Sequence, residues 1–404
     1  MNVLYITYDG LLDPLGSSQI LPYIKGISTH QDGVVILSFE KPERFSQGQQ
    51  SMLSDIMDYR IHWKPLRFTE GLGFMGKLWD LSRMYFWSFY LANKYTTQVV
   101  HARGHAPAQV GLFLKRVLKK KLIFDFRGLW VDERIDKGGW DLSNFFHRLQ
   151  YKYFKRVEKK LLAQADQIVV LTNKVVSEVV KLGASPPSKI TVIPCCADFN
   201  HFPLLTDISI LEAKTLTGIP DNAFVLGYLG SVGDMYMLDH LFHLYELTKN
   251  VRDDYHLLII TQDITALEDL MKRYLKPHLH SFIHIKSASR DDVPRLLPAI
   301  SIMVSFISPS YARIAASPTK IAECFAVGIP VIANDGVGDV AKIINKLDGG
   351  KIVDPFSDED LTKVSHELGK ISAKGGCRLR DVSRPILGLE LANKRYKSVY
   401  EKII

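Results

Sequence analysis

Residues 316–335, ASPTKIAECFAVGIPVIAND, contain the pattern of a whole helix followed at once by an apolar strand. Ser317 is a good N-cap, Pro318 suits the first helical position, and Gly328 has the position just after the helix end. Lys320 conflicts with this pattern, because the helix dipole opposes a cation in the first turn by a few tenths to about 1 kcal/mol. It is either an exposed lysine tolerated at that small cost or a group that meets an anion.

The same alternation of helices and apolar strands extends over the rest of the chain. The expected strands are short, continuous apolar runs, which are typical of parallel strands buried on both faces. They are residues 3–7, 34–39, 98–102, 121–126 and 167–172 in the first half, and 224–230, 255–261, 282–286, 300–306 and 329–334 in the second. Two such series predict an α/β protein with two doubly wound domains, and the polar, irregular stretch near 194–222 predicts the break between them.

Composition limits the class of protein. The chain has 404 residues, 47% hydrophobic and 23% charged, which is typical of a globular protein of two domains. The four cysteines have no metal-ligand spacing, so no metal site or disulfide framework is expected and a reducing cytoplasm is the simplest location. The start, MNVLYITYDG, predicts a first strand instead of a signal peptide, and no apolar run approaches the roughly 20 residues of a membrane span.

Basic residues cluster at 115–121 and 147–160, and aromatic residues lie in or near these stretches and at 79–87. Two interpretations stay open: solvated helix faces, or a surface that meets anionic lipid. Nucleic acid is not an expected partner, because no nucleic-acid-binding motif accompanies the charge.

In an open α/β sheet, ligands bind beyond the carboxyl ends of the strands, so the loops that follow strands matter most. After the first strand, Gly16 lies in a small-residue turn whose N–H groups face either an anion or simply the next helix. His101, Arg103 and His105 alternate at the end of a later strand, and we expect them to project into one cleft. The next loop, DFRGLWVDER at 125–134, supplies more charged residues.

That loop is interpreted as an acceptor site in which Asp125, Arg127 and Glu133 bind hydroxyl groups, with a salt-bridged loop as the alternative. In the second half, Gly230 and Gly233 follow a strand and would let the backbone approach a phosphate closely.

Taken together, the motifs resemble those of the family 4 glycosyltransferases, which are retaining, sugar-nucleotide-dependent enzymes of the GT-B architecture. The segments that carry the resemblance span residues 13 to 333: DPLGSSQILPYI, VVHARGHAPA with DFRGLWVDER, QADQIVVLT, KITVIPCCADFNHF and SPTKIAECFAVGIPVIA. The resemblance implies two facing Rossmann-like domains: an acceptor domain at 1–200 and a donor domain at 201–383. A last helix, at about 384–404, would cross back to the first domain.

The family's site residues can be placed on this sequence. Glu323 matches the second glutamate of the E-x7-E motif, which binds the ribose of the donor nucleotide, and Thr319 lies where backbone amides meet the diphosphate. Gly16 matches the loop glycine near the donor phosphate. His101 matches the strand-end histidine near the transferred sugar and the acceptor.

The departures concern charge. The first glutamate of the motif falls at Ala315, and the family's phosphate-binding Arg and Lys fall at Ser231 and Tyr236. We therefore expect Lys320 and Arg313 to supply the positive charge instead.

The resemblance thus predicts a retaining glycosyltransferase that uses a nucleoside-diphosphate sugar and no metal. The expected acceptor is a saccharide or a lipid-linked saccharide in cell-surface polysaccharide or glycolipid synthesis, in the cytoplasm or at the inner face of the membrane. The alternative is a catalytically silent binding protein on the same fold. The predicted catalytic residues are His101, Arg313, Lys320 and Glu323; the donor residues are Gly16, Gly230, Ser231, Gly233, Ser317 and Thr319; the acceptor residues are Arg103, His105, Asp125, Arg127 and Glu133.

Overall fold

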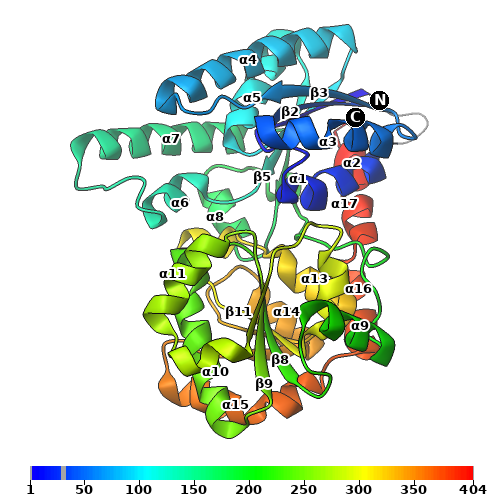
Figure 1. Cartoon of the computed structure of the whole chain (residues 1–404). Helices are drawn as coiled ribbons and strands as arrows, with labels where there is room; N and C mark the ends of the chain where they lie inside the picture. The colour runs from blue at the N-terminus through cyan, green and yellow to red at the C-terminus, as the bar shows by residue number, and fades with distance from the viewer. Residues whose placement is uncertain (1, 29–32, 404) are drawn as a thin grey trace. The chain divides into compact units, whose positions relative to one another are not determined.

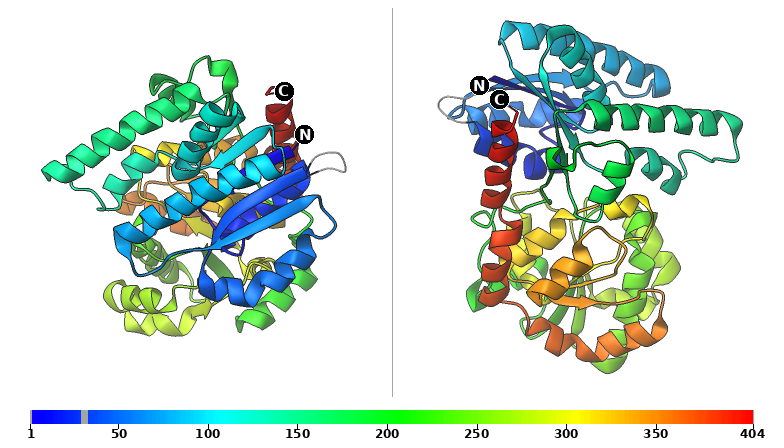
Figure 2. Two further views of the ribbon diagram at one scale, coloured as in Figure 1. Left: turned by 90° about the horizontal axis from the view of Figure 1, so that it is seen from above. Right: turned by 180° about the vertical axis from the view of Figure 1, so that it is seen from behind.

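The computed structural model describes residues 2–28 and 33–403, and it divides into two compact units (Figure 1). The first unit comprises the chain up to Pro194, the short segment Tyr311–Ala316 and the end of the chain from Ala392. The second comprises Cys195–Ser310 and Ser317–Leu391. Each unit contains one parallel sheet with helices on both faces, as the two views of Figure 2 show, so the predicted α/β class is confirmed. The expected domain limits stay a prediction, because this division reflects packing and not independent folding.

The sheet of the first unit has seven strands in the order β3-β2-β1-β4-β5-β6-β7. Their bounds are β1 Asn2–Thr7, β2 Gly33–Glu40, β3 Ile61–Arg67, β4 Val99–Arg103, β5 Lys121–Phe126, β6 Gln167–Val170 and β7 Ile190–Val192. The central strands are almost wholly buried, because helices cover both faces. The strand order reverses between β1 and β4, and a parallel sheet presents its ligand site at such a point.

The helices of this unit are α1 Pro14–Gln19, α2 Leu21–Ile27, α3 Pro42–Ile56, α4 Gly73–Lys94, α5 His105–Leu118, α6 Trp130–Asp136, α7 Phe145–Gln164, α8 Val176–Lys181 and most of α17 Leu389–Glu401. Helix α5 packs against α4 on one side and against α7 on the other, so the three form one layer. Helix α7 begins where Asn144 caps the backbone N–H groups of Phe146 and His147.

The sheet of the second unit has six strands in the order β10-β9-β8-β11-β12-β13. They are β8 Phe224–Leu229, β9 Tyr255–Ile260, β10 Ile283–Lys286, β11 Ile302–Ser305, β12 Val331–Ala333 and β13 Gly350–Ile352. The helices are α9 Asp207–Thr217, α10 Leu238–Val251, α11 Ile264–Tyr274, α12 Val293–Leu296, α13 Thr319–Val327, α14 Val340–Leu347, α15 Asp358–Ser372 and α16 Cys377–Leu387. The order reverses between β8 and β11, so the loops after these two strands are the expected ligand loops.

Two sequence-based expectations about helices are wrong. The stretch near 194–222 is not irregular throughout, because Thr206 and Ser209 form a capping box that starts α9. The single last helix expected from about 384 is two helices, α16 and α17, which meet at Gly388. Within the ranges that the structure describes, none of the helices is both long enough and apolar enough to cross a bilayer.

Candidate active site

Lys320 lies in the first turn of α13, and its side chain turns inward instead of toward solvent. The residue is only 9% exposed, and Nζ lies 4.4 Å from the ring centre of Tyr228 and 5.1 Å from that of Tyr236. Among the described residues Nζ has no hydrogen-bond partner. Burial lowers the pKa of Lys320 from 10.5 to about 8, although Cys324 and Glu323 partly oppose this shift. An exposed, tolerated lysine is therefore excluded, and the site holds a desolvated cation over two aromatic rings.

The loop after β8 closes over this cation. A Cβ atom added at Gly230, whose φ is +141°, would lie 3.1 Å from Lys320 Nζ, so the glycine leaves room for the ammonium group. The Tyr228 hydroxyl donates to the Ser231 carbonyl at 2.6 Å, and Val232 N donates to the Asp263 carboxylate at 2.9 Å. These bonds hold the loop in place. Gly230 lies beside Lys320, and Tyr236 contributes a ring where a family cation was expected.

The start of α13 differs from the prediction. The cap residue is Pro318, not Ser317, and no side chain caps the first turn. The Ser317 hydroxyl instead accepts a hydrogen bond from Cys195 N at 3.1 Å. The first amides of a helix have no intrahelical acceptor, so Thr319 N and Lys320 N remain able to bind a ligand.

Glu323 lies one turn further along α13 and is also buried. Its Oε1 is 3.3 Å from the Arg290 guanidinium, which comes from the loop after β10. Burial raises the pKa of Glu323, while Arg290, Lys320 and His201 oppose that rise. Arg290 could not be predicted from the sequence, because nothing near it in the chain indicates an acidic partner 33 residues away.

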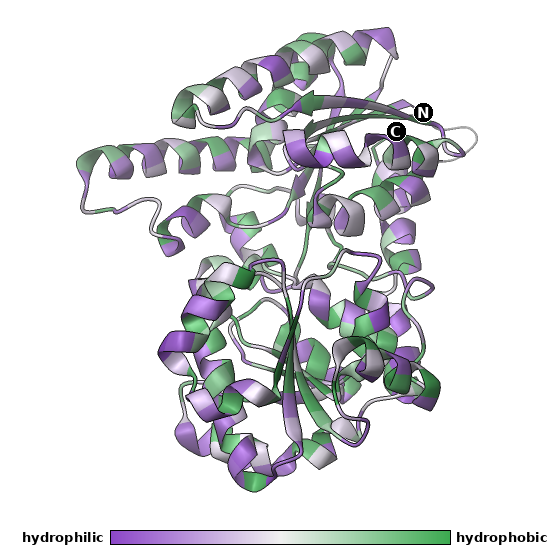
Figure 3. Cartoon of the chain, viewed as in Figure 1, coloured by the Kyte–Doolittle hydropathy of each residue, from purple (hydrophilic) through white to green (hydrophobic). Residues whose placement is uncertain are grey.

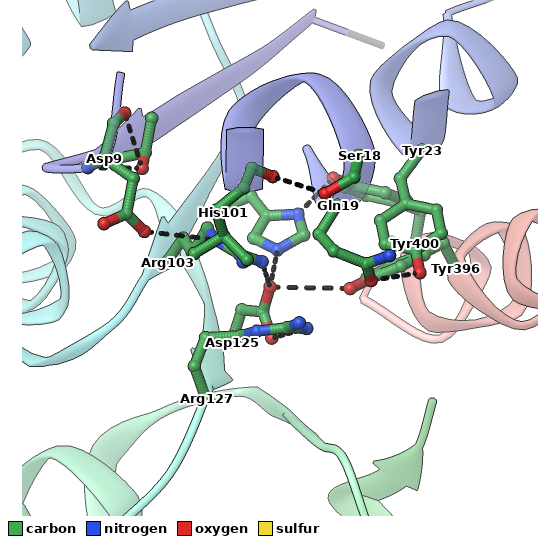
Figure 4. A network of polar contacts seen from close by, with 12 residues as sticks. Asp9, Ser18, Gln19, Tyr23, His101, Arg103, Asp125, Arg127, Tyr396 and Tyr400 are labelled. Carbon is green, nitrogen blue, oxygen red and sulfur yellow. Dashed lines mark hydrogen bonds and ion pairs between the residues drawn. The ribbon is translucent and has the colours of Figure 1, made fainter. Parts of the chain in front are cut away.

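In the first unit, His101 of β4 and Asp125 of the neighbouring strand β5 lie close together and meet the C-terminal helix (Figure 4). His101 Nδ1 shares a 2.6 Å hydrogen bond with the Tyr400 hydroxyl, and His101 Nε2 is 3.7 Å from Asp125 Oδ2. The Tyr396 hydroxyl donates to the same carboxylate oxygen at 3.4 Å. Both His101 and Asp125 are almost completely buried, and burial lowers the pKa of His101, so the imidazole is neutral.

Two arginines converge on the Asp125 carboxylate, each at 3.5 Å: Arg103 from β4 and Arg127 from the loop after β5. Arg103 also lies 3.5 Å from Asp9, which follows β1. Burial alone would raise the pKa of Asp125, but Arg127, His101 and Arg103 hold it well below its ordinary value. The charges in this cluster therefore largely neutralise one another.

Two predicted site residues of the first unit have other roles in packing. His105 does not join His101 and Arg103, because it begins α5 and its Nε2 lies 2.9 Å from Glu158 on α7. Gly16 lies inside α1 and not in a turn, and a Cβ atom there would lie 1.9 Å from the Gly10 carbonyl oxygen. Its missing side chain makes room for the chain's own backbone, so close packing explains this glycine without a ligand.

Arg313 is also buried, in the segment Tyr311–Ala316, which packs in the first unit. His101 is almost completely buried against Tyr400, and its predicted contact with a substrate stays a prediction. Arg127 and Glu133 are only partly buried and can be reached. Ser231 and Gly233 lie in the loop after β8, which approaches Lys320 at Gly230. The described part of the chain contains no group of three or more His, Cys, Asp or Glu side chains suited to a metal ion.

Known structures share this architecture over nearly the whole chain. Anabaena Alr3699/HepE in complex with UDP and glucose has a TM-score of 0.73 and 13% identity, and the match covers 99% of each chain. Sucrose-phosphate synthase from Thermosynechococcus elongatus has a TM-score of 0.73 and 13% identity, over 100% of this chain and 98% of that one. WaaG, a glycosyltransferase involved in lipopolysaccharide biosynthesis, has a TM-score of 0.66 and 16% identity, over 98% of both chains. At these identities the likeness establishes the fold, which is GT-B.

Family models agree with the fold. The model of Glycosyltransferase Family 4 matches residues 32–201, and that of Glycosyl transferases group 1 matches residues 210–371. No curated protein sequence matches the chain significantly. Because the two models together cover both units, the chain belongs to the glycosyltransferases, with a Family 4 first half and a group 1 second half.

Proposed function

We propose that this glycosyltransferase moves a sugar from a nucleoside-diphosphate sugar to a saccharide acceptor, with retention at the anomeric carbon. The observation that carries the proposal is Lys320, a buried cation without a hydrogen-bond partner beside Gly230 at the start of α13. An unpaired buried charge costs free energy, so a site that keeps one is suited to a ligand of opposite charge.

A diphosphate would satisfy three features of this place at once. It would neutralise Lys320, accept from the free amides of Thr319 and Lys320, and lie against the backbone at Gly230 and Gly233. With a pKa of about 8, Lys320 is mostly protonated at neutral pH and ready to pair with an anion. The rings of Tyr228 and Tyr236 hold the charge in place until then.

Glu323 is proposed to bind the nucleotide ribose. A carboxylate can accept from two neighbouring hydroxyl groups, and Arg290 already orients this one at 3.3 Å. The structure of HepE contains UDP and glucose, which supports UDP-glucose as the first donor to test here.

In the proposed reaction the bond between the anomeric carbon and the phosphate oxygen breaks, and its electron pair stays on the leaving diphosphate. The acceptor hydroxyl attacks on the same face and its proton passes to that phosphate oxygen. Lys320 and the α13 amides stabilise the charge that develops on the leaving group. Asp125 is fully buried and paired with two arginines, which argues against a covalent role for it.

The acceptor is proposed to bind at the carboxyl ends of β4 and β5, where Arg127 and Glu133 are accessible. The acceptor class is a saccharide or a lipid-linked saccharide of a cell-surface polymer or glycolipid, made in the cytoplasm or at the inner face of a membrane. The role in lipopolysaccharide biosynthesis of the structural neighbour WaaG supports this class.

The test is calorimetric binding of nucleoside diphosphates followed by donor hydrolysis and transfer assays. Wild-type protein should bind one nucleoside diphosphate, and Lys320→Met should weaken that binding strongly. Lys342→Met, at an exposed lysine of α14, is the matched control and should bind normally. Equal affinity in all three proteins would overturn the phosphate role of Lys320.

The same assays address a catalytically silent binding protein as the competing function. Ala315 in place of the first motif glutamate favours that alternative, because a contact to the donor sugar is lost. Nucleotide binding without hydrolysis or transfer, across a panel of UDP-, GDP- and ADP-sugars with saccharide acceptors, would support it.

A further inference from the structure

Helix α4 is apolar on both of its faces, although only one of them is covered. Its inner face packs on the first unit's core through Met84, Leu91 and Ala92. At about 100° per residue, its exposed apolar residues fall within one arc of roughly 160°. They are Phe74, Met75, Leu78, Trp79, Phe86, Phe89 and Tyr90. The remaining fully exposed residues in that arc, Ser82 and Asn93, are uncharged, and the exposed charged residues of α4, Lys77 and Lys94, flank the arc.

These side chains are exposed to a degree that is unusual for a monomeric protein. Phe74 is 75% exposed, Phe86 66% and Trp79 60%, and Leu72 just before the helix is 62%. A contiguous apolar surface of this kind marks an interaction site.

The rest of the helix layer adds positive charge to this surface. Helices α4, α5 and α7 contain only two acidic residues, Asp80 and Glu158, and both are completely buried. Exposed basic residues lie on α5 and α7 or directly after α5. They are Arg116, Lys119, Arg148, Lys152, Arg156, Lys159 and Lys160. Exposed apolar residues of α7 alternate with them, namely Phe145, Phe146, Leu149 and Tyr153. Figure 3 shows apolar residues interspersed with hydrophilic ones along α4 and α7.

The aromatic residues of α4 and α7 belong to one surface. Tyr85 of α4 packs on Phe113 of α5, and burial, with a smaller contribution from Tyr153 of α7, raises the pKa of Tyr85. The N-termini of α4 and α7 both follow the carboxyl ends of strands. The first residues of α4 and α7, Phe74 and Phe145 among them, therefore lie toward the same end of the sheet as Arg127, which directly follows β5.

We propose that the outer face of the α4–α5–α7 layer docks on an anionic phospholipid bilayer. The apolar side chains at the N-terminal ends of α4 and α7 enter the boundary between headgroups and acyl chains, and the lysines and arginines lie against the phosphates. A second copy of this chain does not fit, because two such surfaces carry charge of the same sign. One consequence rests on the proposed function. The docked surface brings the carboxyl ends of β4 and β5, where the acceptor is proposed to bind, to the membrane, and it therefore selects a lipid-linked saccharide.

Vesicle flotation tests the docking directly. Wild-type protein should float with vesicles of phosphatidylglycerol mixed with phosphatidylcholine at low salt, less at high salt, and not with phosphatidylcholine alone. Phe74→Ser with Trp79→Ser should lower the partition coefficient by about tenfold or more. The matched control, Ile208→Ser with Phe356→Ser, removes equally exposed apolar residues of the second unit and should leave it unchanged.

A second pair of variants tests the charge. Replacing Arg148, Lys152 and Arg156 with Gln should lower the partition coefficient into the anionic vesicles by about a hundredfold, because each lost charge lowers it by about fivefold. Neutralising Lys342, Lys363 and Lys370, which are exposed in the second unit, should have little effect.

Three results would overturn the docking: no flotation of wild-type protein, equal flotation with both vesicle types, or a dimer in sedimentation that Phe74→Ser with Trp79→Ser dissociates. Nucleotide binding measured without vesicles separates the two proposals. If wild-type protein floats but binds no nucleoside diphosphate, the docking stands and the proposed function fails.

Discussion

Both units have buried charged residues near the point where the strand order of the sheet reverses. The two units differ in whether the buried charge has a counter-charge beside it. In the first unit, Asp125 is buried between Arg103 and Arg127. In the second, Lys320 is buried beside the rings of Tyr228 and Tyr236 and without a hydrogen bond to any described residue. A paired cluster can stabilise the fold, whereas a buried cation without a partner costs free energy. We therefore propose a structural role for the cluster around Asp125 and a ligand-binding role for Lys320.

Asp125→Asn should give the largest effect, on stability. It would remove the carboxylate shared by the buried Arg103 and the partly buried Arg127, would leave only the half-exposed Asp9 near Arg103, and should lower the free energy of unfolding by about 3–5 kcal/mol. Because the folded-state pKa of Asp125 is depressed, its contribution is present above the ordinary Asp pKa and lost as the pH falls further below it. Urea denaturation followed by circular dichroism measures this loss.

The control is Asp9→Asn, because Asp9 contacts the same Arg103 but its side chain is 49% exposed. Its expected cost is below about 1 kcal/mol. If the two variants were equally stable, the first cluster would not be a structural charge pair.

Lys320→Met should change activity and leave stability unharmed. Losing one preorganised cation at the leaving group lowers kcat/KM by about two orders of magnitude or more. The free energy of unfolding should stay constant or rise, since a buried unpaired charge is removed. Steady-state kinetics and thermal unfolding of Lys320→Met, with Lys342→Met beside it, measure both. A destabilised variant with normal kinetics would reverse the assignment.

The pH dependence of nucleotide binding should also distinguish the unpaired Lys320 from the paired cluster around Asp125. Only protonated Lys320 pairs with a diphosphate, and its pKa in the free protein is about 8. Affinity should therefore be constant well below that pH and fall above it by up to about tenfold per pH unit, with proton uptake on binding. Calorimetry in buffers of different ionisation enthalpy detects the uptake. The Lys320→Met variant should lack both effects, and wild-type affinity that is flat through this range would contradict the prediction.

The smallest effect concerns the C-terminal helix. Tyr400→Phe removes the 2.6 Å partner of His101 Nδ1 and should lower the free energy of unfolding by about 1 kcal/mol. Tyr396→Phe should cost less, because Asp125 keeps both arginines and the lost bond is long, at 3.4 Å. Urea denaturation compares the two variants, and a larger loss for Tyr396→Phe would show that this helix is held mainly through Asp125.

The central strands could be predicted from the sequence, but not all of those at the sheet edges. The strands that were not predicted are β3, β7 and β13, each of which is the last strand at one edge of its sheet. Strand β3, IHWKPLR, contains polar residues and Pro65 and is therefore no continuous apolar run. Strands β7 and β13 have only three residues each. Central strands are covered on both faces and next to other strands, so they need continuous apolar runs, whereas edge strands do not.

The same limit applied to the site. Residues grouped along one segment, such as Lys320 and Glu323, could be recognised from their spacing on a helix. Arg290 and Tyr400 could not, because they meet their partners across 33 and 299 residues of sequence. The expectation that His105 joins His101 and Arg103 was wrong for a related reason. The strand ends before His105, and the helix that begins there directs its side chain toward Glu158.

Local pattern was enough to establish the two α/β units, the helix that starts near residue 319 and the presence of a cation in its first turn, because periodicity and helix-end preferences act over a few residues. Whether that cation was exposed, paired or waiting for a ligand depended on Tyr228, Gly230 and Tyr236, which reach Lys320 only when β8 and β11 pair. Burial and charge pairing arise from packing between distant segments, so only the tertiary structure decided them.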